Sequence, residues 1–108
     1  MGFVDVIVLE VCQREIKEFP DEVKDLILDS IALLRAGHTL SMPLSRPMPS
    51  IGKGVYELRY KDKKAQFRVG YFVKKKSGIY LLHAFKKKDQ KTPKKNIDLI
   101  KKRMRKLL

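Results

Sequence analysis

The amino-acid sequence predicts one α+β domain over residues 1–108, with elements in the order β-α-α-β-β-β-α and a mostly antiparallel sheet packed by helices. Three observations lead to this prediction. A chain of 108 residues has the usual length of one domain, which argues against a two-domain enzyme. Two segments place apolar residues at helical spacing. The second half holds three β-rich segments separated by short turns.

The first strand is expected within residues 3–11, where aliphatic and β-branched residues are nearly continuous. Such a run fits a strand that is buried on both faces. Residues 13–19 are expected to form a short helical link.

A helix is expected to follow, because Pro20 suits a first helical turn and the acids after it suit the positive end of a helix. Its apolar face comprises Val23, Leu26, Ile27, Ile31 and Leu34. Gly37 predicts the end of this helix. His38, just beyond, could be a ligand or a base, but a cation near the negative helix end is the favoured interpretation.

Residues 39–54 form the linker of the chain, and their prolines and glycines predict irregular structure. Too little apolar sequence precedes this linker for it to separate two domains.

Three strands are then expected at residues 55–60, 65–73 and 79–85, joined by hairpin connections at residues 62–64 and 74–78. Alternation places one set of side chains on a core face: Leu58, Tyr60, Phe67, Val69, Tyr71, Val73, Ile79, Leu81 and Phe85. If Lys63 and Lys64 form a two-residue turn, Arg59 lies directly opposite Arg68, and both point away from that core.

The last helix is expected to begin with Thr92 as N-cap and Pro93 as first helical residue. Its apolar stripe comprises Ile97, Ile100, Met104, Leu107 and Leu108.

Charge is distributed unevenly between the two halves of the chain. The net charge is +13. Residues 1–52 hold five Lys/Arg and eight acids, a net of −3, whereas residues 53–108 hold twenty and four, a net of +16. A soluble surface does not require such sorting, so the pattern favours a polyanionic partner.

Several classes of site and location are not expected. Cys12 is the single cysteine, which excludes an internal disulfide and a cysteine-based metal site. Phosphate-loop, Ser-His-Asp and metal-ligand spacings do not occur. No apolar run reaches the length of a membrane span. We therefore expect a cytoplasmic protein without cofactor, metal or membrane partner.

Arg59 and Arg68 are the most distinctive candidate site residues. Like charges opposed across an antiparallel pair are destabilising, unless an anion lies between them. The planar guanidinium can hold phosphate with two hydrogen bonds. Two solvated arginines with diverging side chains are the alternative. Glu57 shares their face and is expected to be an ion-pair partner rather than a base.

A lysine cluster follows the third of these strands and leads into the last helix, whose free N–H groups also favour anions. The end of the strand, the lysines and the start of the helix could together bind a nucleic-acid backbone. Clustered lysines also lower one another's pKa. A solvated face is the alternative. The lysines are Lys86, Lys87, Lys88, Lys91, Lys94 and Lys95.

Two further residues have a predicted place on the sheet. Alternation assigns His83 to the face of Leu81 and Phe85, as a buried, hydrogen-bonded histidine that does not reach the Arg59/Arg68 face. Tyr80 has the parity of that face, where a base could stack on it.

Four motifs together resemble the HigB-like, phage-derived branch of the RelE toxin superfamily. They cover about half of the chain, in the family's order and spacing. The motifs are Gly54–Arg59, Phe67–Val69 followed by Tyr71 and Phe72, Leu82–Lys87, and Lys91–Pro93.

The resemblance implies a RelE-like fold and the toxin of a type II toxin–antitoxin pair. It implies metal-independent cleavage of mRNA on the 70S ribosome, in which the RNA 2′-hydroxyl attacks the adjacent phosphate, and a cognate antitoxin, expected to be a helix-turn-helix protein. By resemblance, Arg68 matches the phosphate-binding arginine and Arg59 the arginine of the Glu-Leu-Arg motif. Lys87 stands near another arginine of RelE, and His83 matches the family's histidine, so Arg68, Lys87 and His83 are the catalytic candidates.

One departure from RelE concerns proton transfer. RelE has a tyrosine a few residues past the basic pair, but residues 89–93 here contain none. Lys86, Lys87, Lys91 and His83 remain open candidates for the base. A non-catalytic RNA-binding or regulatory protein, or a DNA-binding accessory protein, would use the same basic face.

Overall fold

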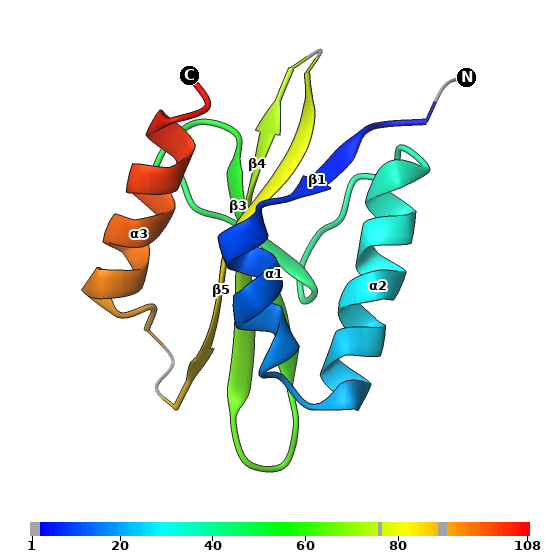
Figure 1. Cartoon of the computed structure of the whole chain (residues 1–108), viewed down its shortest axis with the longest axis vertical. Coiled ribbons are helices and arrows are strands. Elements are labelled where there is room, and N and C mark those ends of the chain that lie inside the picture. Colours follow the sequence, from blue (N-terminus) through cyan, green and yellow to red (C-terminus); the bar gives the residue numbers. More distant parts are fainter. Residues whose placement is uncertain (1–2, 76, 89–90) are drawn as a thin grey trace.

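The computed structural model describes residues 3–75, 77–88 and 91–108. In this part of the chain the strands form one five-stranded sheet with the order β1-β5-β4-β3-β2 (Figure 1). Strand β1 is parallel to β5, and the other pairs are antiparallel. The strands are β1 (Val6–Val8), β2 (Ser45–Pro47), β3 (Val55–Lys61), β4 (Gln66–Lys74) and β5 (Gly78–Lys87). The helices are α1 (Glu10–Lys17), α2 (Asp21–Arg35) and α3 (Lys94–Arg105).

Helices lie on both faces of the sheet and make three layers. The larger core joins α1 and α2 to one face through Cys12, Ile27, Leu58, Val69 and Leu81. The smaller core joins α3 to the opposite face through apolar residues that include Val55, Phe72, Leu82 and Ile100. Helix α3 approaches the sheet closely at Gly70, because a Cβ there would lie 2.7 Å from the Ile100 side chain. The smaller core therefore holds α3 across β4 and β5, on the sheet face that carries the predicted site.

The predicted α+β class is confirmed, and the predicted elements occur in the predicted order, but the structure adds the strand β2, and the first strand is shorter than expected. It ends at Val8, and α1 begins at Glu10, inside the apolar run. Ile7 and Val11 are 38% and 39% exposed, so the run is not buried on both sides. A short apolar run does not distinguish a strand from the start of a helix, which explains the error.

The linker contains an edge strand that its prolines had argued against. Ser45–Pro47 pairs with β3, and the Ser45 hydroxyl is 2.6 Å from the Tyr71 hydroxyl. Proline is tolerated on an edge strand, where its missing N–H need not face a partner. The expectation of wholly irregular structure over residues 39–54 was therefore wrong.

Helix α2 agrees with its predicted boundaries, and Gly37 follows it with a φ of +91°. Four of the five expected apolar side chains are buried, but Leu26 is 46% exposed. His38 lies just beyond the helix and is exposed.

The β3–β4 hairpin has the predicted register. Asp62 N–H donates to the Ala65 carbonyl, so Lys63 and Lys64 form a two-residue turn. Arg59 is consequently paired with Arg68. Lys76, in the second predicted hairpin connection, lies outside the described residues.

A bulge in β5 reverses the side-chain alternation that the sequence had predicted. Gly70 pairs with His83 and Tyr71 with Leu81, so Leu82 is the extra residue. Beyond it, His83 and Phe85 lie on the face of Arg68 rather than on the face of Leu81. The predictions that Phe85 belongs to the larger core, and that the register keeps His83 off the arginine face, were therefore wrong.

Candidate phosphate-binding site

Three arginines from three adjacent strands line one cleft on the α3 side of the sheet. The turn register places Arg59 on β3 and Arg68 on β4, and β2 adds Arg46, which pairs with Glu57. The cleft has a volume of about 640 Å³, and its lining residues are Pro43, Leu44, Arg46, Arg59, Tyr60, Lys61, Gln66 and Arg68. We call it the arginine cleft.

Arg68 is almost fully enclosed, with 3% of its surface exposed. Its Nε lies 3.2 Å from the Glu57 carboxylate, and its Nη2 donates to the Gln66 side chain. Burial lowers the pKa of Arg68, Glu57 opposes that effect, and Arg59 and Arg46 lower the pKa further. Arginine nevertheless stays charged, so the cleft is strongly positive.

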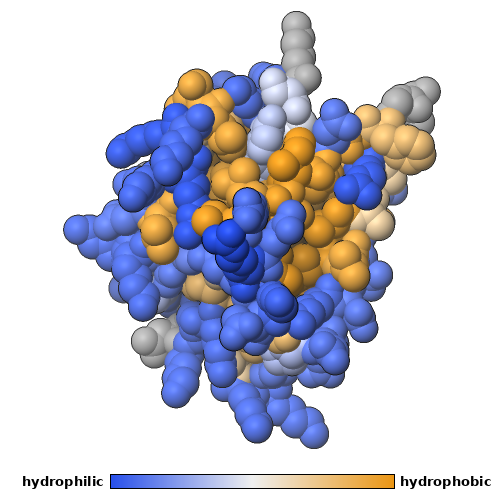
Figure 2. Space-filling view, viewed as in Figure 1, coloured by the Kyte–Doolittle hydropathy of each residue, from blue (hydrophilic) through white to orange (hydrophobic). Residues whose placement is uncertain are grey.

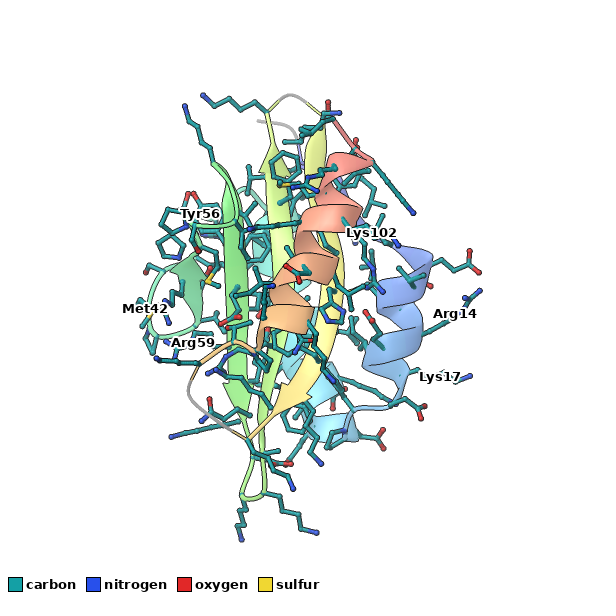
Figure 3. The ribbon with its side chains drawn as sticks, turned by 90° about the vertical axis from the view of Figure 1, so that its left-hand side faces the viewer. Arg14, Lys17, Met42, Tyr56, Arg59 and Lys102 are labelled. Atoms are coloured by element: carbon teal, nitrogen blue, oxygen red, sulfur yellow. The ribbon has the colours of Figure 1, made fainter. Side chains whose placement is uncertain are left out.

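The arginine cleft contains hydrogen-bond donors that its own residues do not satisfy. Among the described residues, the buried Nε of Arg59 has no hydrogen-bond partner, and the buried Nε of Arg68 has the ion-pair contact with Glu57 but no hydrogen bond. The Arg59 Nη1 lies 3.5 Å from the Met42 sulfur, a weak acceptor; Figure 3 labels both residues on the same side of the sheet. Unsatisfied buried donors are costly, and an anion in the cleft would satisfy those of Arg59.

Lys87 lies on the same face, whereas its neighbours do not. Lys87 pairs with Gln66 at the end of the sheet and is 4% exposed. Burial lowers its pKa, Arg68 lowers it further, and Glu57 partly opposes this. The cause is therefore burial and arginine, not the mutual effect of lysines that the sequence suggested. Lys86 pairs with Phe67 on the opposite face and is exposed.

The other expected RNA-binding lysines lie at the surface between the end of β5 and the start of α3. Lys88 follows β5, Lys91 precedes α3, and Lys94 and Lys95 begin α3; all four are exposed. Asp89 and Gln90 lie outside the described residues. No membrane-length apolar helix occurs in residues 3–75, 77–88 and 91–108.

Thr92 was expected to cap α3, but Pro93 occupies the N-cap position, without a side-chain cap. The Thr92 hydroxyl instead donates to Glu57 Oε2 at 2.8 Å. Glu57, expected as an ion-pair partner of Arg59, pairs with Arg68.

His83 belongs to a separate buried group that we call the histidine cluster: Glu15, His83, Asn96 and Arg103. Its Nδ1 is 2.8 Å from Glu15, and its Nε2 is 2.7 Å from Asn96. Glu15 also accepts from Arg103 and from the Ala84 N–H. Both ring nitrogens thus have partners, so contact with a substrate would require His83 to leave Glu15 or Asn96.

Tyr80 has the predicted parity but does not join the arginines. It pairs with Phe72, four residues along β4 from Arg68, which corresponds to about 13 Å. It packs against the core beneath α3 instead.

Sequence reasoning missed Arg46, Glu15, Asn96 and Arg103. Recognising an edge strand at residues 45–47 would have indicated Arg46, because alternation then places it beside Glu57. No local pattern indicates the histidine cluster. The described residues hold no group of three metal-ligating His, Cys, Asp or Glu side chains.

Comparison with known proteins identifies the family. Residues 14–105 match the phage-derived Gp49-like family, DUF891, and the chain belongs to it. Its fold is similar to one chain of the crystal structure of the toxin–antitoxin complex RelBE2 from Mycobacterium tuberculosis, with a TM-score of 0.55 and 13% identity, over 82% of this chain and 97% of that one. No curated protein sequence matches the chain. The predicted family and RelE-like fold are confirmed.

Proposed function

We propose that this protein is the toxin of a type II toxin–antitoxin system and that it cleaves mRNA on the ribosome. The observation that supports this best is the convergence of Arg46, Arg59, Arg68 and the buried Lys87 on one sheet face. Membership of the Gp49-like family and the fold shared with a chain of a toxin–antitoxin complex agree with it. The net charge of +13 suits an RNA-rich target.

The proposed reaction uses the RNA itself as nucleophile. The 2′-oxygen loses its proton and attacks the adjacent phosphorus, and the bond from phosphorus to the 5′-oxygen breaks. The products are a cyclic phosphate and a 5′-hydroxyl, whose oxygen receives a proton. Negative charge on the phosphoryl oxygens rises in the transition state, where Arg68 and Arg59 would stabilise it.

Lys87 is the residue that we assign to proton transfer. It lies on the phosphate-binding face, and its lowered pKa brings it nearer to neutral pH than an ordinary lysine. Lys86 faces the other side of the sheet, and His83 has partners on both ring nitrogens. We therefore assign His83 a positioning role, in which it holds Asn96 at the start of α3.

The partners that we propose follow from the same assignment. The substrate is mRNA in the 70S ribosome, with Lys88, Lys91, Lys94 and Lys95 contacting its backbone or neighbouring ribosomal RNA. A cognate antitoxin, expected to be a helix-turn-helix protein, would offer an acidic surface to this charge. We propose that the toxin acts in the cytoplasm, where ribosomes are found.

Induced expression of the wild type and of Arg68→Ala tests this function, with growth and mRNA 5′ ends read together. We expect the wild type to arrest growth and to create new 5′ ends in frame with codons, and the variant to do neither. If soluble wild-type protein, free of antitoxin, leaves growth unchanged and mRNA intact, the proposal that the protein cleaves mRNA is wrong. A non-catalytic RNA-binding protein would then be the better assignment, or a DNA-binding one if duplex DNA competes better than RNA.

A further inference from the structure

Thr92 connects the lysine-rich segment before α3 to the middle of the sheet. Its hydroxyl donates to Glu57 Oε2 at 2.8 Å, although the two residues are 35 positions apart. The hydroxyl makes no helix cap, since Pro93 is the N-cap residue. Lys91 and Lys94, on either side of Thr92, are exposed. This hydrogen bond therefore fixes the basic segment relative to β3.

Glu57 is an unexpected group in a cleft suited to anions. A carboxylate repels phosphate, yet this one is 1% exposed and lies among Arg46, Arg59 and Arg68. Its two oxygens are divided between two tasks: Oε2 accepts from Thr92, and Oε1 lies 3.2 Å from the Arg68 Nε. Because this buried carboxylate would weaken phosphate binding, we expect it to contribute to the function of the site in another way.

The contacts of Arg68 indicate that contribution. The guanidinium makes an ion pair with Glu57 at Nε, without a hydrogen bond there, and Gln66 accepts a hydrogen bond from Nη2. A planar guanidinium restrained by an ion pair at one nitrogen and by a hydrogen bond at another has a narrow range of orientations, which determines where its Nη1 points. Catalysis depends on such orientation, because a displacement of about 1 Å can cost about 100-fold in rate.

We propose that Thr92 and Glu57 are positioning residues that hold Arg68 in the orientation needed to bind the phosphate under attack. Thr92 contacts Glu57, and Glu57 contacts Arg68. These contacts set the position of Arg68 relative to an RNA backbone that is bound by Lys91 and Lys94. This inference rests on the proposed function, and it adds two residues to the proposed site.

A purely structural role predicts a different result. A buried ion pair often contributes little net stability, and a partly buried hydroxyl contributes still less. Loss of the Thr92 hydroxyl should therefore lower the cleavage rate more than it lowers the melting temperature. A structural role would instead lower stability and leave the rate of the folded protein unchanged.

The experiment compares four variants of the full chain: Thr92→Val, Thr92→Ser, Glu57→Gln and Thr39→Val. Valine has the shape of threonine without the hydroxyl, and serine keeps the hydroxyl. Thr39 is exposed outside the arginine cleft, which makes Thr39→Val the matched control. Ribosomes programmed with mRNA are mixed with excess purified toxin. Single-turnover cleavage gives the rate at saturation and the toxin concentration for half saturation, and a thermal melt is recorded for each variant.

We expect Thr92→Val to lower the saturating rate about tenfold with an unchanged half-saturation concentration, as for an interaction needed in the transition state. Thr92→Ser and Thr39→Val should match the wild type. Glu57→Gln should lose more rate than Thr92→Val; if it does not fold, Thr92→Val still decides the question.

Two outcomes overturn the inference, and they are distinguishable. If the wild type cleaves and Thr92→Val cleaves equally fast, or loses only melting temperature, the positioning role is wrong and the proposed function stands. If the wild type itself leaves ribosome-bound mRNA intact, the proposed function is wrong, and the positioning role is wrong with it.

Discussion

The arginine cleft and the histidine cluster both enclose charged side chains beside α3, but their polar atoms are satisfied differently. In the histidine cluster, Glu15 accepts from His83, Arg103 and the Ala84 N–H, and His83 has a partner on each ring nitrogen. In the arginine cleft, within the described residues, the Nε of Arg59 has no hydrogen-bond partner, and the Nε of Arg68 has an ion-pair contact with Glu57 but no hydrogen bond. A network in which the polar groups are hydrogen-bonded to one another stabilises the fold, whereas unpaired donors that line a cleft are available to bind a ligand.

The histidine cluster joins α1 to α3 through β5, whereas the arginine cleft is built on β2, β3 and β4. Figure 2 shows apolar surface among the polar side chains on the face that carries α1 and α2. The arginine cleft lies on the other face of the sheet, at the edge formed by β2, which contributes Arg46. The molecule thus keeps its phosphate-binding groups apart from its largest core, and variants of the two regions should fail in different ways.

Arg68→Ala should have the largest effect, because it removes the charge that stabilises the phosphoryl oxygens. We expect the single-turnover cleavage rate to fall about 1,000-fold. The substitution also leaves Glu57 buried without its cation, so a thermal melt must show that the variant is folded. Arg68→Lys, which keeps the charge but not the planar fork, should recover part of the rate. A folded Arg68→Ala protein with more than a tenth of wild-type activity would contradict the assignment.

Glu15→Ala should affect stability rather than chemistry. It leaves Arg103 and the Ala84 N–H without their acceptor, which should lower the free energy of unfolding by about 3 kcal/mol. Urea denaturation measures this change. The control Glu18→Ala, at an exposed position of the same segment, should change it by less than about 0.5 kcal/mol. Equal stability of the two variants would show that the histidine cluster does not hold α1 and α3 to the sheet.

Acid should weaken the histidine cluster, because Glu15 loses the charge to which its three donors bind. Burial alone would raise the pKa of Glu15, but hydrogen bonds from His83, Arg103 and Ala84 lower it below its ordinary value of 4.5. Stability from Glu15 is therefore present above that value and is lost as the pH falls through the lower pKa of the folded state. Denaturation midpoints measured between neutral pH and pH 3 should fall more steeply for the wild type than for Glu15→Gln. Parallel curves would be evidence against this pKa shift.

Arg46→Ala should have the smallest effect, on binding alone. Arg46 is exposed at the edge of the arginine cleft, so it should contribute one phosphate contact rather than transition-state charge. We expect about a threefold higher half-saturation concentration, an unchanged saturating rate, and a log–log salt slope reduced by about one. Arg14→Ala is the control, because Figure 3 shows Arg14 on α1, well apart from Arg59. An unchanged salt slope would show that Arg46 does not contact a phosphate.

The local part of the site could be predicted because it depends on neighbours along the chain. A two-residue turn at Lys63 and Lys64 determines that Arg59 faces Arg68, whatever the rest of the molecule does. Strand alternation likewise separates Lys86 from Lys87 once the register of β5 is known. The position of His83 could not be obtained this way, because the bulge at Leu82 reverses the alternation within β5.

The sequence by itself determined the α+β class, the three long strands, the opposed arginines and the basic second half of the chain. Each of these depends on residue spacing of two or of three to four, or on composition, which require no knowledge of distant contacts. Only the tertiary structure decided that Arg46 joins the cleft, that Thr92 reaches Glu57 instead of capping α3, and that Glu15 holds His83. Those contacts join residues that are far apart in the chain. They depend on burial, because a carboxylate removed from water needs hydrogen-bond donors, and the packing of the helices and strands determines which donors lie close enough.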